Sequence, residues 1–364
     1  MELDTFLPLA EELLAIRSTA DRPDDLHRAL DFVLDVVGTG FAVERFESDG
    51  KPSALVHLGG SRPEFRVILN AHLDVVPGAP EQFRPRREGD RLHARGAQDM
   101  KLSALVQALV FRDVAAGLPF PVALQLVTDE EVGGRDGTRH QLERGVRGRF
   151  VVIGEHSGLR LVTESKGLLN ARLRATGRSA HSAYQWLGDN ALLKVMRAVD
   201  GLLAAYPVAT GEAWRTTVNV AGVETTNTAL NQVPADATAW LDIRFPPEDA
   251  DFDGRSAQEV AAHLAALCPP GVVVEVDQVE PPHRADPGST DVAALRRAAR
   301  SQGYSGDFLR KHGAADSRFY YQRGVDAVIF GIGGDGQHGP DEWADLTTVV
   351  PYYRALAAYL RAVA

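Results

Sequence analysis

The chain has 364 residues, a length that favours about two domains over a single core. Its hydrophobic content of 45% and charged content of 24% are typical of a soluble globular protein. The formal net charge of -10 argues against nucleic acid or an anionic membrane as the main partner. The single cysteine, Cys268, excludes a disulfide within the chain and a cysteine-based zinc site, so histidines and carboxylates must hold any metal.

The N-terminal segment, MELDTFLPLAEELLAIRS, predicts an amphipathic helix that starts near Asp4 or Thr5. It has no basic region before an apolar run, so we do not interpret it as a signal peptide. No apolar run approaches the length of a membrane span. We therefore expect a cytoplasmic protein.

Four short, almost continuously apolar runs predict strands that are buried on both faces of a sheet. These runs are residues 65–70, 122–127, 150–153 and 327–330. Helices are expected around them at 102–116, 139–142, 291–302 and from about 346. Strands that alternate with helices indicate an α/β domain with a mainly parallel sheet.

Between these segments, apolar and polar residues alternate, which is typical of strands with one wet face. The expected strands and helices are strand 165–175, helix 190–203, strands 216–223 and 237–245, helix 257–267 and strand 272–276. Their order is that of a ferredoxin-like α+β unit with an antiparallel sheet. The Pro- and Gly-rich segment 279–288 is interpreted as a linker. We therefore predict a small domain, residues 166–280, inserted into a larger one of residues 1–165 and 281–364.

Histidines and carboxylates follow all four buried strands, and a further carboxylate opens a helix. They are His72 and Asp74, Asp129–Glu131, Glu155 and His156, His338, and Asp99 at the helix start. Side chains at the carboxyl ends of parallel strands gather at one edge of the sheet. Separately, these segments have ordinary interpretations as capped or acidic turns, and an Asp at a helix start is usually a cap.

Taken together, the segments predict a metal centre of His and carboxylate ligands, which suit Zn, Mn or Co. Five ligands with one shared carboxylate would make two similar sites. The neighbours Glu130 and Glu131 also suit a division of labour, in which one binds metal and the other carries a proton. The glycines at 331, 333 and 336 resemble a dinucleotide fingerprint, but Pro340 interrupts the helix that such a motif requires.

The chain resembles the M20 metallopeptidases, a family that includes acetylornithine deacetylase, succinyl-diaminopimelate desuccinylase and carboxypeptidase G2. The segments that carry the resemblance are HLD at 72–74, ARGAQDMK at 94–101, TDEEVGG at 128–134, IGEH at 153–156, GRSAHSA at 177–183, LDIR at 241–244, and QHGPDE around His338. They occur in one order over nearly the whole chain. The resemblance implies a metallopeptidase-type α/β catalytic domain with an inserted lid and dimerisation domain, and a homodimer.

The resemblance also implies a role for each matching residue in a centre of two divalent ions, with Zn favoured and Co or Mn possible. Asp99 would bridge the two metals; His72 and Glu155 would complete one site, and Glu131 and His338 the other. Asp74 would orient His72, and Glu130 would be the general base and acid. In the inserted domain, His181 would stabilise the oxyanion, often in the partner subunit, Arg244 would bind a substrate carboxylate, and Asn231 would add a substrate contact.

The sequence departs from the desuccinylase pattern at Ala314 and Ala315, where hydroxyl residues precede the Asp of that branch. This departure favours an N-acetyl amino acid, such as acetylornithine, or a small peptide over a succinyl substrate. IGEH also replaces the commoner IGEP, so His156 could perturb the metal site. The substrate is expected to be a small molecule with a free carboxylate.

Two kinds of alternative stay open. A dipeptidase, a carboxypeptidase or a succinyl-diaminopimelate desuccinylase on the same scaffold would use the same site, because these substrates also present a free carboxylate. A catalytically silent binding protein is an alternative of a different class. The complete ligand set and the intact Glu130 argue against that second alternative.

Overall fold

The computed structural model describes residues 1–363, which form two compact units. The first unit contains Met1–Thr163, Arg284–Arg310 and the described residues from Ala315 onward. The second unit contains Glu164–His283 together with Lys311–Ala314. The boundaries expected from the sequence fall within three residues of 163/164 and 283/284, whereas nothing in the sequence signalled the return of the chain to the second unit at 311–314.

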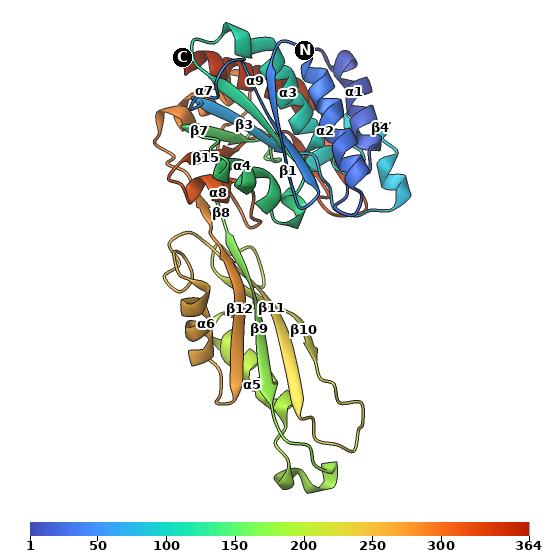
Figure 1. Cartoon of the computed structure of the whole chain (residues 1–364), viewed down its shortest axis with the longest axis vertical. Helices are drawn as coiled ribbons and strands as arrows, with labels where there is room; N and C mark the ends of the chain where they lie inside the picture. Colours follow the sequence, from blue (N-terminus) through green and yellow to red (C-terminus); the bar gives the residue numbers. More distant parts are fainter. Residues whose placement is uncertain (364) are drawn as a thin grey trace. The chain divides into compact units, whose positions relative to one another are not determined.

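A nine-stranded sheet forms the centre of the first unit (Figure 1). Its strands are β1 (Ala42–Ser48), β2 (Lys51–His57), β3 (Val67–His72), β6 (Val122–Val127), β7 (Phe150–Ile153), β8 (Leu161–Ser165), β13 (His283–Arg284), β14 (Phe308–Lys311) and β15 (Asp326–Ile329). Their order is β1-β2-β6-β3-β7-β15-β8-β13, and β14 pairs with β8. The four predicted strands β6, β3, β7 and β15 are parallel neighbours in the middle, while β1, β2 and β8 pair antiparallel. The predicted α/β fold class is confirmed.

Helices cover both faces of this sheet. They are α1 (Leu3–Ala15), α2 (Pro23–Val37), α3 (Leu102–Val114), α4 (His140–Glu143), α7 (Thr290–Ser301), α8 (Ser317–Tyr321) and α9 (Val349–Ala362). Successive residues of β3 belong to different apolar clusters: Val67 and Leu69 pack with α1, α2, α3, α7 and α9, and Ile68 packs with residues of α4 and α8. Burial on both faces therefore explains why this strand is apolar without alternation.

The second unit has the strand and helix order expected from its alternating pattern. Its elements are β9 (Gly167–Thr176), α5 (Ala191–Ala205), β10 (Thr217–Glu224), β11 (Asp236–Phe245), α6 (Ala257–Ala266) and β12 (Val272–Glu280). The four strands form an antiparallel sheet in the order β10-β11-β9-β12. The apolar face of β9, which includes Leu169 and Leu173, packs in one cluster with both helices.

A small third sheet, which the sequence did not predict, connects two loops of the first unit. Its strands are β4 (Arg86–Glu88), β5 (Arg91–His93), β16 (Gly333–Asp335) and β17 (Trp343–Asp345), in the order β16-β17-β5-β4. The pairing of β5 with β17 brings the residues after β5 beside those before β17. The loop that contains Asp99 and the loop that contains His338 are thereby joined to one sheet.

The interpretation of residues 279–288 as a linker is wrong in part. β12 continues to Glu280, β13 joins the large sheet, and the backbone N–H of Ala285 donates to the carbonyl of Thr163 at 2.8 Å. Pro281 and Pro282 lack N–H groups, but the residues around them keep theirs and use them in pairing. Among the described residues, no helix combines the length and apolarity that crossing a membrane requires.

The segment Lys311–Ala314 is attached to the second unit by three contacts. The N–H of Lys166 donates to the carbonyl of Lys311 at 3.2 Å. The ring of His312 lies 5.5 Å from the ring of Trp214, and its Nε2 lies 3.4 Å from the Glu212 carboxylate. This short segment is therefore part of the second unit, although its neighbours on both sides in the chain belong to the first.

Candidate metal centre

The predicted ligands of the first unit come together at the carboxyl edge of its parallel strands. His72 ends β3, Glu131 and Glu155 follow β6 and β7, and His338 lies in the loop between β16 and β17. Asp99 precedes α3 in a turn whose backbone is not helical at this residue. Because β6, β3, β7 and β15 are parallel neighbours, their carboxyl ends converge on the same edge.

His72 is buried and faces carboxylates on both sides of its ring. Its Nε2 lies 3.1 Å from Asp99 Oδ1 and 3.1 Å from Glu155 Oε1. Its Nδ1 lies 3.0 Å from the backbone oxygen of Asp74 and 3.5 Å from the Oδ1 of that residue. Asp74 thus orients the ring so that Nε2 points toward Asp99 and Glu155.

His338 forms a second group with the other oxygen of Asp99. Its Nε2 lies 3.3 Å from Asp99 Oδ2 and 3.0 Å from Glu131 Oε2. Asp99 therefore lies between two histidines, with one oxygen facing each of them. The His338 side chain is 48% exposed, in contrast to Asp99 at 3% and Glu131 at 8%.

The donor spacing fits metal coordination. Two ligands bound tetrahedrally at about 2.0–2.1 Å lie roughly 3.3–3.4 Å apart, close to the 3.0–3.3 Å separations of His72 and His338 from their carboxylates. Three overlapping groups have donor atoms within 4.8 Å of one another: His72, Asp99 and Glu131; His72, Glu130 and Glu155; and Asp99, Glu155 and His156. Nitrogen and carboxylate oxygen donors of this kind suit Zn, Mn or Co.

The charges of these groups also favour a cation. Burial raises the pKa of Glu131 to about 7, and hydrogen bonds to Asp99 and Glu131 raise the pKa of His338 to about 10. Burial alone would raise the pKa of Asp99, yet hydrogen bonds from His338 and His72 hold it well below its usual range. In the absence of metal, protons therefore balance the carboxylate charge, and metal binding would release them.

Glu130 faces the same space from the position next to Glu131. Its carboxylate belongs to a donor group with His72 and Glu155, and its side chain is 14% exposed. Burial raises the pKa of Glu130 well above its usual range. The backbone N–H groups of Glu130 and Glu131 donate to the Asp74 carboxylate at 3.2 and 2.9 Å, so Asp74 fixes this turn as well as the His72 ring.

Residues 68–362 match the family model described as peptidase family M20/M25/M40. The chain belongs to this family. It is a metal-dependent amidohydrolase or peptidase, as the M20 resemblance predicted.

Two curated relatives illustrate the range of M20 proteins to which the chain is similar. A succinyl-diaminopimelate desuccinylase of Acidiphilium cryptum is 29% identical over 356 residues, which cover 92% of this chain and 92% of the relative. A protein of Aspergillus clavatus named "Probable carboxypeptidase" is 35% identical over 279 residues, which cover 68% of this chain and 60% of the relative.

Solved structures share the fold of this M20 chain. The aminopeptidase PepT of Bacillus cereus superimposes with a TM-score of 0.80 at 16% identity, covering 100% of this chain and 99% of the other. A Bacillus subtilis protein described as a dinuclear metal binding peptidase from the M20 family has a TM-score of 0.66 at 15% identity, covering 99% and 98%. At these identities the comparison supports the fold alone.

The three predicted substrate and oxyanion residues of this M20 chain lie in the second unit. Asn231 is close to His181, because its carbonyl accepts the N–H of Ser182 at 2.9 Å. His181 Nδ1 accepts the N–H of Ala183 at 3.1 Å. The Arg244 guanidinium forms a two-pronged contact with Asp242, at 2.8 and 3.0 Å. Their roles at the metal centre stay predictions.

Several polar residues of the M20 site had no predicted role. Gln337 donates to Asp99 Oδ2, and Arg318 lies 4.0 Å from the Glu130 carboxylate while donating to the Gly133 carbonyl at 2.7 Å. Gln337 lies in the QHGPDE segment that carries the resemblance, and Arg318 lies three residues after Ala315. Their closeness in the sequence to residues with predicted roles was therefore the signal that could have identified them.

Proposed function

We propose that the chain hydrolyses the amide bond of an N-acyl amino acid, and that an N-acetyl amino acid such as acetylornithine is its main substrate. The observation that carries this proposal is the position of Asp99 between His72 and His338, with Glu130 facing the same space. This arrangement supports two cations that share one carboxylate, next to a carboxylate that is free to carry protons.

The five donors would hold two divalent ions, with Asp99 bridging, His72 and Glu155 on one side, and Glu131 and His338 on the other. Zinc is the preferred ion, with cobalt or manganese as alternatives. When bound, such ions polarise the amide carbonyl and lower the pKa of water.

Glu130 performs the proton transfers. It accepts one proton from the attacking water and delivers it to the nitrogen of the leaving amine. The water oxygen bonds to the carbonyl carbon and the C–N bond breaks. The second proton of the water also passes to the amine, so the amide and water become a carboxylate and an ammonium group. Burial raises the pKa of Glu130 above its usual range in the metal-free protein, which favours a group that can hold the transferred proton.

The second unit serves as lid and dimerisation domain in this proposal. His181 donates a hydrogen bond where negative charge develops on the carbonyl oxygen. Arg244 binds the substrate carboxylate, a planar task that its fork suits, in competition with Asp242. Asn231, beside His181, contributes a further contact. A homodimer through this unit and a location in the cytoplasm belong to the same proposal.

The acyl group is the least constrained part of the substrate. Ala315 is 2% exposed and packs in the apolar cluster with Phe319, so a hydroxyl there would face the core. The missing hydroxyl at Ala314 is therefore the departure that disfavours a succinyl group. The names of the relatives favour a second candidate, namely a desuccinylase or a carboxypeptidase.

A hydrolysis panel tests the proposal. N-acetyl amino acids, N-succinyl amino acids and dipeptides are incubated with the protein, and its metal content is measured on the same preparation. We expect N-acetyl substrates to give the highest kcat/KM with about two ions per chain. Preference for a succinyl substrate or a dipeptide would replace the N-acetyl proposal with its alternative. Metal binding without turnover on any substrate would favour a binding protein.

A further inference from the structure

A buried ion pair links the two loops that carry Asp99 and His338. The register of β5 and β17 pairs His93 with Trp343, and the N–H of Ala94 donates to the carbonyl of Glu342 at 3.2 Å. The next residue, Arg95, then meets the Glu342 side chain: its Nη1 lies 2.5 Å from Glu342 Oε2, and the two side chains are 3% and 1% exposed.

Two further polar atoms of this pair, Arg95 Nη2 and Glu342 Oε1, bind the backbone of both loops. Arg95 Nη2 donates to the carbonyls of His338 and Gly339 at 3.2 and 3.0 Å. Glu342 Oε1 accepts the N–H groups of Gln98 and Asp99 at 3.0 and 3.1 Å. One ion pair therefore fixes the main chain at a predicted ligand of each loop.

His338 depends on such a contact more than the other ligands do. Its side chain is half-exposed, so packing does little to hold it. Its φ of 59° lies in the left-handed region, which few non-glycine residues adopt. The Arg95 guanidinium holds the carbonyl of this residue and thus the direction of its side chain.

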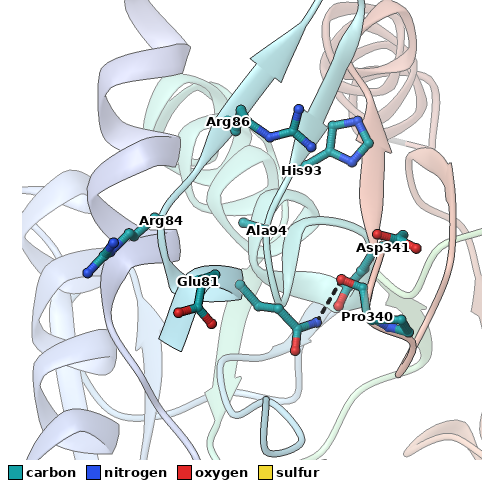
Figure 2. A pocket seen from close by; sticks show the side chains of 9 residues that line it. Glu81, Arg84, Arg86, His93, Ala94, Pro340 and Asp341 are labelled. Carbon is teal, nitrogen blue, oxygen red and sulfur yellow. Dashed lines mark hydrogen bonds between the residues drawn. The ribbon is translucent and has the colours of Figure 1, made fainter. Parts of the chain in front are cut away.

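The loop after His338 borders open space on its outer side. A pocket of about 210 Å³ borders it there, and Figure 2 shows Pro340 and Asp341 facing Arg86 and His93 across this space. Gln82 also binds this loop, since its Nε2 donates to the carbonyls of Gly339 at 2.9 Å and Pro340 at 3.2 Å. Gln82 and Arg95 thus each donate to two carbonyls of residues 338–340, and Arg95 is the donor that binds the carbonyl of His338.

We propose that Arg95 and Glu342 are positioning residues. They would set the spacing of Asp99 and His338 for the metal ion that His338 and Glu131 would hold. This inference rests on the two-metal centre of the proposed function. A buried ion pair gives little net stability, because the loss of hydration offsets the attraction between the charges. The role proposed for this pair is therefore geometric and acts on two predicted ligands.

The test measures stepwise zinc binding to metal-stripped protein in competition with a chromophoric chelator. The variants are Glu342→Gln, Arg95→Lys, and Arg95→Met combined with Glu342→Leu, which removes both charges and leaves no lone buried ion. Arg66→Lys is the matched control, because Arg66 forms a two-pronged ion pair with Asp291 that contacts neither loop. His338→Ala identifies the binding step that depends on His338.

We expect the wild type and Arg66→Lys to bind two ions with similar affinities. In the three pair variants, the step lost in His338→Ala should weaken by about tenfold or more, as for other residues that orient ligands, and the other step should change less. Affinities within twofold of wild type, even with reduced unfolding stability, would overturn the proposal, as would equal weakening in the control. A wild type that binds fewer than two ions would instead refute the two-metal function.

Discussion

Replacing Glu130 with Gln separates chemistry from metal binding. The substitution keeps the size and one oxygen of the side chain but removes its ability to accept a proton. A positioned general base contributes roughly 10²–10⁴-fold, or about 3–5 kcal/mol of activation free energy. The neighbouring carboxylates Glu131 and Glu155 face histidines at the predicted metal sites. No spare base is then at hand, so we expect a loss of kcat of about 10⁴-fold.

The same variant should also be more stable than the wild type when metal is absent, which separates a loss of chemistry from a loss of folding. Burial raises the pKa of Glu130 above the ordinary glutamate value of 4.5 in the metal-free protein. As pH rises above 4.5, the unfolded chain ionises first, so Glu130 lowers stability progressively until the pH passes its folded pKa. Gln removes this loss. The metal-free variant should therefore gain stability relative to wild type as pH increases, by at most about 1.4 kcal/mol per pH unit.

Three measurements test the role of Glu130: kcat on the best substrate, metal content, and urea unfolding of metal-stripped protein between pH 5 and pH 8. Glu64→Gln is a suitable control, because this exposed residue pairs only with Arg149 at the surface. Residual activity above about one tenth of wild type, with two metals bound, would refute the role of Glu130 as the base. Loss of both metals would show that Glu130 acts as a ligand.

Three further outcomes are expected. Chelation should abolish turnover, and added Zn, Co or Mn should restore it; activity that survives complete removal of metal would contradict the proposed chemistry. If His181 acts in the partner's site, a heterodimer of His181→Ala and Glu130→Gln subunits should recover activity, and no recovery in verified heterodimers would count against such sharing. Burial lowers the pKa of Lys101 to about 7. The free energy of unfolding of the wild type should therefore rise with pH between about 7 and 10.5, and it should rise less in Lys101→Met. Parallel curves for the two proteins would show that this Lys is not desolvated.

The parallel strands were predictable because burial on both faces leaves a direct mark on the sequence. The runs at 65–70 and 150–153 are almost entirely apolar, and the structure places them at β3 and β7. The hairpin of β1 and β2 was missed, although its turn carries Asp49-Gly50, a strong hairpin signal, with φ of 45° and 68°. β1 lies at the edge of the sheet and alternates half-buried and exposed residues, so its pattern is weaker, whereas β2 lies between β1 and β6 and is buried from Pro52 to His57.

The candidate site was predictable in its ligands but not in what holds them. His72 and Glu155 stand at strand ends, where local sequence and topology suffice to bring them together. The contact between Arg95 and Glu342 joins residues 247 positions apart in the sequence. It depends on the register of two three-residue strands, which are too short to leave a periodic pattern. The conformation of His338 follows from that long-range contact.

The discontinuity of the second unit limits how this chain can be recombined with its relatives. A chimaera that exchanges residues 164–283 alone would take Trp214 from one parent and His312 from the other. The contact of His312 with Glu212 would be mismatched in the same way. Successful transplantation of the unit should therefore require Lys311–Ala314 to be exchanged together with the main insert. An exchange of this unit between homologues would therefore need two pairs of crossover points, one around residues 164–283 and one around residues 311–314.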